Sequence, residues 1–283
     1  MANFILYGYA GDVDFAEASL AALARIRKPD ERIIYLDDVF EPSPDNFKKE
    51  MQGRYNVEFG TTYHPRNGNL IGPEHTKANF ALLEKYSKDA ADGVCVKVDC
   101  DTLVLSRVWL DEFIADESKS LAAGFHSQPN YMFGLCYAVK HPLAKWLCED
   151  VVTNPPWMKC FEDYEISYRV HARWPERIKR FALAKPHVSR WYCMNPGDIP
   201  QGARADVLDV NRGAPRKQVL DVMRGTVEAA LAADKKQKET KHEENPDQCS
   251  SMGADQVCSG CTCCSPGSDV PKGKKQRNLQ AAD

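Results

Sequence analysis

The chain of 283 residues is long enough to bury a full hydrophobic core, and this length predicts one or two domains. Hydrophobic residues make up 43% and charged residues 27% of the chain, which is typical of a globular protein and excludes a wholly disordered one. The formal net charge of -3 gives no electrostatic reason to expect nucleic-acid binding. No run of residues approaches the roughly 18 apolar positions of a membrane helix.

The N-terminal segment has no basic leader, and its short apolar run ends before Gly11 and Asp12. We interpret it as a first strand, not as a signal peptide. Of the 11 cysteines, six are scattered through the apolar-patterned body and five lie between Cys249 and Cys264. Without a secretory signal, the scattered six are expected to be reduced core thiols. We therefore expect a cytoplasmic protein without a transmembrane segment.

Apolar runs and helical spacings alternate along the first 205 residues, and residues 41–72 between them lack periodicity, which predicts a long loop. In chain order, we expect a strand at 4–9, a helix from residue 14, a strand at 32–36, a helix at 73–88, a strand at 94–105, strands at 121–125 and 134–139, helices at 142–152 and 162–172, and a strand near 179–183. Such alternation predicts an α/β fold in which helices flank a mainly parallel mixed sheet.

The composition changes after about residue 205. A helical stripe of apolar residues continues to Leu231, residues 234–244 are charged, and residues 245–283 contain almost no large apolar side chain. A segment of that kind cannot bury enough surface to offset its ordering entropy. We therefore expect a domain at 1–205, an amphipathic and charged helix within 206–244, and a disordered cysteine-rich tail at 245–283.

In the run 94–105, an expected apolar strand carries two carboxylates, Asp99 and Asp101, one residue apart at its end. Alternate residues of a strand face the same side, so both carboxylates should point one way and Cys100 the other. Two such oxygen ligands suit a hard divalent cation, Mg2+ or Mn2+, which can neutralise a diphosphate. A non-functional acidic turn after a strand has the same D-x-D sequence, so the surrounding features are needed to distinguish a metal site from such a turn. Ligands of parallel sheets bind beyond the carboxyl ends of the strands, where this pair lies.

With these features in place, residues 1 to about 195 resemble the GT-A superfamily of nucleotide-sugar glycosyltransferases. The phrase KVDCDTLVL is similar to the metal-site strand of that family. Upstream, GPEHTKAN resembles the family's glycine-to-Arg-Asn helix start, with Lys77 in place of the commoner Arg and with Asn79 near the donor. Downstream, NYMFGLC resembles the glycine loop that shapes the acceptor side, with Gly134 as its key residue.

Two later features complete the resemblance. The pair Glu162-Asp163 opens an expected helix, as in the family's E-D motif, and His187 in KPHVSRWY matches the C-terminal metal-binding histidine. The resemblance implies a GT-A-like fold with a Rossmann-like nucleotide-binding half. It also implies site residues: Asp99, Lys77, Asn79 and Gly134 at the donor, Asp99, Asp101 and His187 at Mn2+ or Mg2+, and Asp163 with Glu162 in catalysis.

The chemistry of sugar transfer requires residues of these types. Negative charge grows on the leaving diphosphate, and a bound metal ion stabilises it. The acceptor hydroxyl loses a proton as it attacks, and Asp163 at a helix N-terminus is the candidate base. The resulting prediction is a metal-dependent, inverting glycosyltransferase. Its substrates would be a nucleotide-diphospho-sugar donor and a hydroxyl of a glycan, lipid or protein.

Each candidate also has a structural interpretation. The pair Glu162-Asp163 suits a plain acidic first helical turn, His187 suits a hydrogen-bonded structural histidine, and Gly134 suits the start of a strand. Aromatic residues are mostly expected in the core, although Trp157 and Trp191 lie in loop contexts that suit stacking on a sugar. The aromatics near these motifs are Tyr131, Phe133, Trp157, Trp174, Trp191 and Tyr192.

Two other functions stay open. A haloacid-dehalogenase-like phosphohydrolase also places D-x-D after an apolar strand, but it requires Thr or Val where Leu103 stands, and its motif ends the first strand of the fold. The third interpretation is a non-catalytic sugar-nucleotide-binding protein. In the tail, only Cys258 and Cys261 have zinc-knuckle spacing. Metal binding, acylation of Cys263 and Cys264, redox chemistry, partner binding and low-complexity drift therefore remain open for it.

Overall fold

The computed structural model describes residues 1–62, 72–116, 120–126, 132, 134–156, 161–182, 207–209 and 215–244. Two compact units follow from the contacts, Met1–Ala232 and Ala233–Asp283. The strands are β1 (Ala2–Gly8), β2 (Ile33–Asp38), β3 (Val57–Thr62), β4 (Val94–Asp99), β5 (Thr102–Val104), β6 (Ala122–His126), β7 (Cys136–Lys140), β8 (Ile178–Ala182) and β9 (Val207–Asp209). The helices are α1 (Val13–Ile26), α2 (Asp45–Tyr55), α3 (Pro73–Lys88), α4 (Val108–Ala115), α5 (His141–Thr153), α6 (Glu162–Arg173) and α7 (Arg216–Glu244), with 3-10 turns η1 (Ala10–Asp12) and η2 (Pro175–Arg177).

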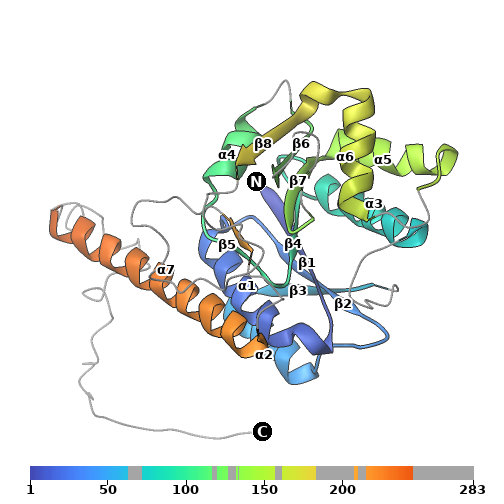
Figure 1. Cartoon of the computed structure of the whole chain (residues 1–283). Coiled ribbons are helices and arrows are strands. Elements are labelled where there is room, and N and C mark those ends of the chain that lie inside the picture. Colours follow the sequence, from blue (N-terminus) through green and yellow to red (C-terminus); the bar gives the residue numbers. More distant parts are fainter. Residues whose placement is uncertain are drawn as a thin grey trace, which may run out of the picture. The chain divides into compact units, whose positions relative to one another are not determined.

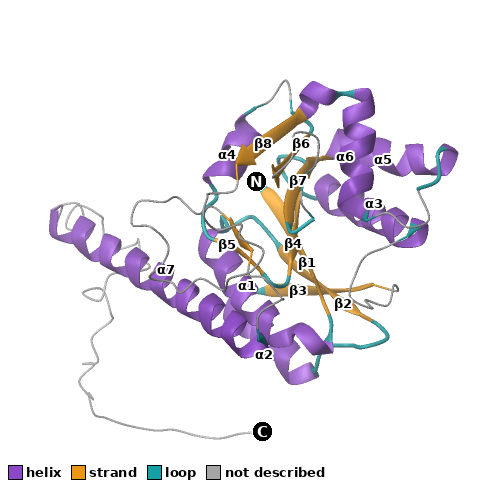
Figure 2. Ribbon diagram, in the orientation of Figure 1, coloured by secondary structure: helices purple, strands orange, loops and turns teal. Residues whose placement is uncertain are grey.

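A seven-stranded sheet in the order β3-β2-β1-β4-β7-β6-β8 forms the centre of the first unit (Figure 2). Four neighbouring pairs are parallel, and β7 runs antiparallel to both β4 and β6. A small second sheet pairs β5 with β9. The predicted class, α/β with a mainly parallel mixed sheet, is therefore confirmed.

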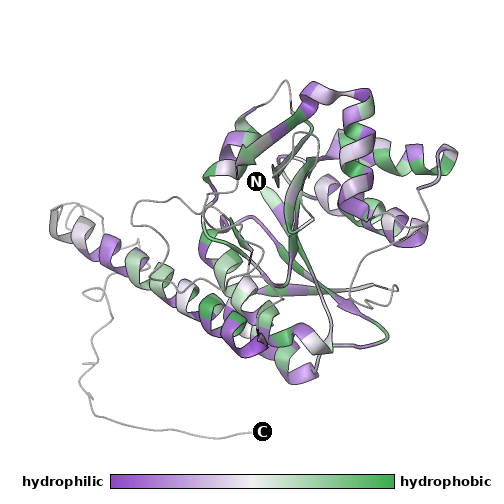
Figure 3. Ribbon diagram, viewed as in Figure 1, coloured by the Kyte–Doolittle hydropathy of each residue, from purple (hydrophilic) through white to green (hydrophobic). Residues whose placement is uncertain are grey.

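Helices cover both faces of the large sheet (Figure 1). On one face, α1, α2 and α4 pack through residues such as Leu20, Met51 and Trp109. On the other, α3, α5 and α6 pack through residues such as Phe80 and Leu143. Each flanking helix carries hydrophilic as well as hydrophobic residues (Figure 3), as expected for helices with one buried side. All seven residues of β1 are buried, which explains its nearly unbroken apolar sequence.

The predicted long loop at 41–72 is wrong in part, because α2 and β3 occupy residues 45–62. The signal in the sequence is weak, since α2 buries only Phe47 and Met51 and β3 is an edge strand with exposed positions. The expected helix at 73–88 and the helical stripe that continues to Leu231 are confirmed by α3 and α7. The predicted disordered tail at 245–283 lies outside the described residues.

The cysteines within the described part of the chain are free thiols, and no disulfide occurs among them. Cys95, Cys100 and Cys136 are buried, and Cys148 is half-buried. This agrees with the expectation of reduced core thiols for these four. Among the described helices, none combines the length and the apolar character needed to cross a bilayer.

Candidate active site

The order in which strands are added to the sheet reverses between β1 and β4, although these two strands are parallel. From β1 the chain continues outward to β2 and β3, whereas β4 lies on the other side of β1 and leads toward β7. In open α/β sheets, ligands bind at such a switch point, in the crevice beyond the carboxyl ends of the strands. Asp99 is the last residue of β4 and pairs with Tyr7 near the end of β1. The D-x-D segment therefore lies at the switch point.

The predicted single strand at 94–105 is interrupted at the D-x-D segment. Asp99 ends β4, Cys100 and Asp101 form a turn, and β5 begins at Thr102. Because Asp101 lies in this turn and not in a strand, strand alternation does not determine the side to which its side chain points. The sequence-based expectation that Asp99 and Asp101 face one side as alternate strand residues therefore does not apply. The carboxylate of Asp99 is 28% exposed, whereas Asp101 as a whole is 7% exposed.

Contacts from neighbouring elements hold this turn in place. The buried thiol of Cys100 donates to Oδ2 of Asp12 at 3.2 Å. The hydroxyl of Ser19 on α1 lies 2.6 Å from the carbonyl oxygen of Cys100 and 2.8 Å from that of Thr102. The backbone of the turn is therefore held by the side chains of Asp12 and Ser19.

A buried lysine joins the D-x-D strand to the helix α6. Nζ of Lys97 lies 2.6 Å from Oδ1 of Asp99 and 3.2 Å from Oε1 of Glu162, and it donates to the carbonyl oxygen of Gly134. Burial disfavours the charged form, but the two carboxylates outweigh burial, so the pKa of Lys97 is raised above its ordinary value. Lys97 thus connects three candidate site residues with one positive charge.

Sequence reasoning missed Lys97, although a signal was present. Lys97 precedes Asp99 by two positions in an otherwise apolar strand and so faces the same side. A lysine is almost never fully buried unless it is paired. Its partner Glu162 lies far along the chain, so only the fold reveals the pairing.

Gly134 and Asp163 are in direct contact. The backbone N–H of Gly134 donates to Oδ2 of Asp163 at 2.6 Å, and the backbone N–H of Tyr164 donates to Oδ1 at 2.7 Å. A Cβ atom on Gly134 would lie 2.8 Å from Oδ2 and 3.1 Å from Cγ of Asp163. Only glycine therefore allows the carboxylate to approach this closely. The position of Asp163 in the first turn of α6 also places the positive end of the helix dipole beside its charge.

Glu162, the first acid of the pair, is buried beside Lys97. It is 4% exposed, and burial raises its pKa. The positive charge of Lys97 opposes this rise, whereas Asp163 and Asp99 add to it. Glu162 therefore lies in a cluster in which three carboxylates share one ammonium group.

The two predicted donor residues on α3 have different environments. Asn79 is 2% exposed; its side chain accepts from the hydroxyl of Tyr7 at 2.6 Å and donates to the hydroxyl of Tyr137 at 2.8 Å. Asn79 thus connects α3 to β1 and β7 beneath the switch point. The side chain of Lys77 is 42% exposed and pairs with Glu74 at 3.1 Å. The structure brings neither of these residues into the Lys97 cluster.

Asp99 and Asp101 would supply oxygen ligands to a divalent cation, and their carboxylate chemistry fits Mg2+ or Mn2+. Within the described ranges, no group of three His, Cys, Asp or Glu side chains is arranged to hold a metal ion. The predicted third ligand, His187, lies outside those ranges. The aromatic candidates Tyr131, Phe133, Trp157, Trp191 and Tyr192 also lie outside them, and Trp174 is half-buried against Trp146.

No family model matches the sequence, and no curated protein matches it. Solved structures with similar folds include a mannosyltransferase from Pyrobaculum calidifontis in complex with GDP-Man and Mn2+; it is 14% identical, the match covers 67% of this chain and 59% of that one, and the TM-score is 0.45. A 4-diphosphocytidyl-2C-methyl-D-erythritol synthase from Anaerococcus prevotii is 10% identical over 79% of this chain and 97% of its own, with a TM-score of 0.47.

Xyloside xylosyltransferase 1 from mouse is 10% identical over 76% of this chain and 99% of its own, with a TM-score of 0.42. The chain spans less than two thirds of the mannosyltransferase. The likeness to these proteins lies in the fold. At these identities and scores, the similarity carries no assignment of activity.

Proposed function

We propose that the chain is a divalent-metal-dependent glycosyltransferase that moves a sugar from a nucleotide-diphospho-sugar to a hydroxyl acceptor with inversion. One observation carries this proposal: Asp163, Gly134, Lys97 and Asp99 form a single bonded cluster at the switch point of the sheet. A carboxylate base and the acidic turn are thereby held at the same edge, as transfer from a diphosphate to a hydroxyl requires.

The metal site would be formed by Asp99 and Asp101, with His187 as the proposed third ligand. A divalent cation bound there would supply Lewis-acid stabilisation of the leaving diphosphate. Lys97 fixes the orientation of Asp99 through the 2.6 Å ion pair. Because the side chain of Lys97 is only 2% exposed, water does not compete for its ammonium group, and the ion pair holds the carboxylate of Asp99 in one position. Lys77 and Asn79 remain proposed residues of the site that binds the sugar-nucleotide donor. Asn79 would act by holding Tyr7 and Tyr137 in place through its two hydrogen bonds.

Asp163 would accept the proton from the attacking hydroxyl. Its two backbone N–H donors fix the plane of the carboxylate and stabilise its negative charge, so the group is oriented before the acceptor arrives. Each carboxylate oxygen accepts more than one hydrogen bond, which leaves capacity for the acceptor hydroxyl. Glu162 would act indirectly, by pairing with Lys97, which also pairs with Asp99. General-base catalysis of this kind contributes about 10²- to 10⁴-fold in rate.

Thermal shift measurements with a panel of sugar nucleotides, with and without Mn2+, test the donor site, and GDP-mannose is a reasonable first member. Ligand binding stabilises the fold by RT ln(1 + [L]/Kd), so a donor raises the melting temperature only with metal if the proposal holds. Asp101→Ala should abolish this shift, and His187→Ala should reduce it less, because water can occupy one vacant metal position. A metal-dependent shift that survives in Asp101→Ala would refute the metal-site assignment.

With a donor identified, Asp163→Asn tests the base. We expect kcat and kcat/KM to fall together by about 10²-fold or more, while donor binding is retained. Turnover near the wild-type rate would remove the proposed inverting base. Two control assays separate the other functions. Hydrolysis of p-nitrophenyl phosphate would identify a phosphohydrolase, and metal-dependent donor binding without any turnover would identify a binding protein.

A further inference from the structure

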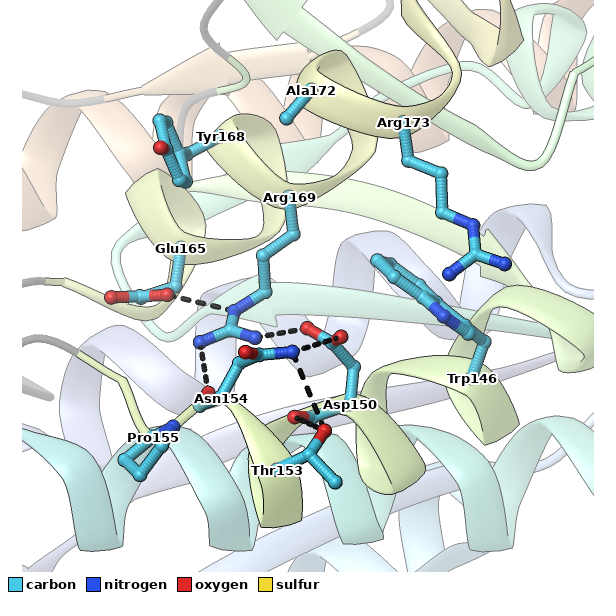
Figure 4. A pocket seen from close by; sticks show the side chains of 10 residues that line it. All are labelled: Trp146, Asp150, Thr153, Asn154, Pro155, Glu165, Tyr168, Arg169, Ala172 and Arg173. Carbon is cyan, nitrogen blue, oxygen red and sulfur yellow. Dashed lines mark hydrogen bonds and ion pairs between the residues drawn. The ribbon is translucent and has the colours of Figure 1, made fainter.

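A cavity with a volume of about 720 Å³ lies between α5 and α6. Figure 4 shows Tyr168 and Trp146 at its two ends, with the Arg169 side chain between them. Asp150 and Asn154, at the end of α5, line the opposite wall. The cavity thus combines two aromatic side chains with several hydrogen-bonding groups.

The polar wall of the cavity is fixed before any ligand binds. The guanidinium of Arg169 donates to Glu165 at 2.9 Å, to Asp150, and to the carbonyl oxygen of Asn154 at 2.8 Å. The side chains of Arg169 and Glu165 are only 7% and 4% exposed, so this network forms a buried and rigid base. Asn154 also donates to Oδ1 of Asp150 at 2.9 Å. Preorganised polar groups of this kind bind a ligand at little entropic cost.

This cavity is not part of the transfer site. Successive helical residues are rotated by about 100°, so Glu165, Arg169 and Ala172 lie on the side of α6 away from Asp163 and Ser167. The contacts agree: Asp163 binds the N–H of Gly134, whereas Glu165 binds Arg169 toward α5. A ligand in the cavity would therefore be held by α6 without touching the reacting atoms.

The charges of the lining select the class of ligand. The acids Asp150 and Glu165 balance the bases Arg169 and Arg173 in formal charge. Arg169 is paired with the two acids, and the guanidinium of Arg173 lies 5.0 Å from the ring centre of Trp146. A lining whose formal charges cancel gives no net electrostatic gain to an anion or a cation, and a purely apolar ligand would cover its charged groups without hydrogen-bonding to them.

We infer that the α5–α6 cavity is a binding site for a neutral saccharide, separate from the transfer site. Saccharide hydroxyl groups can donate to the carboxylate of Asp150, whose side chain is 15% exposed, because each carboxylate oxygen accepts more than one hydrogen bond. The C–H faces of the sugar rings can pack on Tyr168, which lines the cavity and is 51% exposed. The inference concerns binding only and does not depend on Asp163 or on any transfer activity.

The test uses the full chain in the presence of EDTA and without any sugar nucleotide, so that metal-dependent binding at the transfer site does not contribute. Neutral gluco-, manno-, galacto- and xylo-tetrasaccharides at millimolar concentration are screened by saturation-transfer NMR, and the affinity of each binder is measured by calorimetric titration. We expect at least one to bind. Tyr168→Ala and Ala172→Trp should each weaken its affinity by about tenfold or more, by removing a stacking ring and by filling the cavity.

Tyr164→Ala is the matched control, because Tyr164 is a similarly exposed tyrosine one turn earlier on α6 that does not line the cavity. It should leave the affinity unchanged. Three results would each overturn the inference: no binding by any tetrasaccharide, binding that neither Tyr168→Ala nor Ala172→Trp weakens, or an equal loss in Tyr164→Ala. Failure of transfer activity would not affect this outcome, since the assay contains neither metal nor donor.

Discussion

Replacing Lys97 by methionine would remove the one positive charge from the cluster while keeping a long, flexible side chain in its place. Nζ of Lys97 lies 2.6 Å from Asp99 and 3.2 Å from Glu162, and its side chain is 2% exposed. With an effective dielectric constant of about 20, each attraction is about 5–6 kcal/mol, much of which offsets the desolvation of the charges. Removing one partner of a buried ion pair costs about 3–5 kcal/mol. We therefore expect Lys97→Met to lower the melting temperature by roughly 10 °C.

The loss should depend on pH in a defined direction. Burial already raises the pKa of Glu162, and Lys97 opposes that rise, so the variant should raise the pKa further. A carboxyl group whose pKa is raised by folding contributes stability that is fully present below its unfolded value of about 4.5 and is lost as the pH rises through its folded value. Lys97→Met should therefore be least destabilised near pH 5 and most destabilised near pH 8.

Urea unfolding of the wild type and the variant at both pH values measures this difference. Lys145→Met is the matched control, because Lys145 is an exposed lysine on α5 that forms only a 4.0 Å pair with Glu149, and its change should stay within about 0.5 kcal/mol. Adding Glu162→Gln to Lys97→Met should restore part of the stability, since it removes an unpaired buried charge. A loss below about 1 kcal/mol that is equal at both pH values would show that Lys97 does not hold these carboxylates.

Three further outcomes are expected. Gly134→Ala places a Cβ atom 2.8 Å from Oδ2 of Asp163, so transfer should fall by about 10²-fold while Mn2+-dependent donor binding persists; full turnover would contradict the proposed contact. Arg216→Ala removes the ion pairs with Asp12 and Asp14; because the Arg216 side chain is 47% exposed, the free energy of unfolding should fall by at most about 1 kcal/mol. A larger fall in thermal unfolding would mean that solvent screens these pairs less than expected. A chain that ends after Thr240 should keep its melting temperature and its activity, because the first compact unit ends at Ala232; a fall of several degrees would assign a stabilising role to the tail.

The elements that were predicted well have a strong local signal. In α3, Pro73 at the first helical position and the spacing of Phe80 and Leu83 predict both the start and the buried side. β1 is a run of buried residues that suits a central parallel strand. By contrast, β3 at the sheet edge buries only its two end residues, Val57 and Thr62, so its sequence lacks a strand pattern.

The candidate site shows the same division between local and distant information. The order of motifs places Asp99, Gly134 and Asp163 near one edge of the sheet, and the structure joins them by hydrogen bonds and an ion pair. Sequence spacing could not show that Lys97 links them, because its carboxylate partners come from two different elements. It also could not show that the D-x-D segment is a turn, since the apolar letters continue from β4 into β5.

The turn that carries Asp101 is anchored at both ends by different sheets. On its N-terminal side, Asp99 closes β4 of the large sheet, and on its C-terminal side Leu103 pairs with Leu208, more than one hundred residues later in the chain. During synthesis, the first four strands can therefore pair before β9 exists, whereas the second anchor has to wait for it. Contacts between such distant segments form late because closing a long loop costs entropy. The C-terminal anchor of the acidic turn should thus form at the end of folding, after the contacts that Asp12 and Ser19 make with the turn.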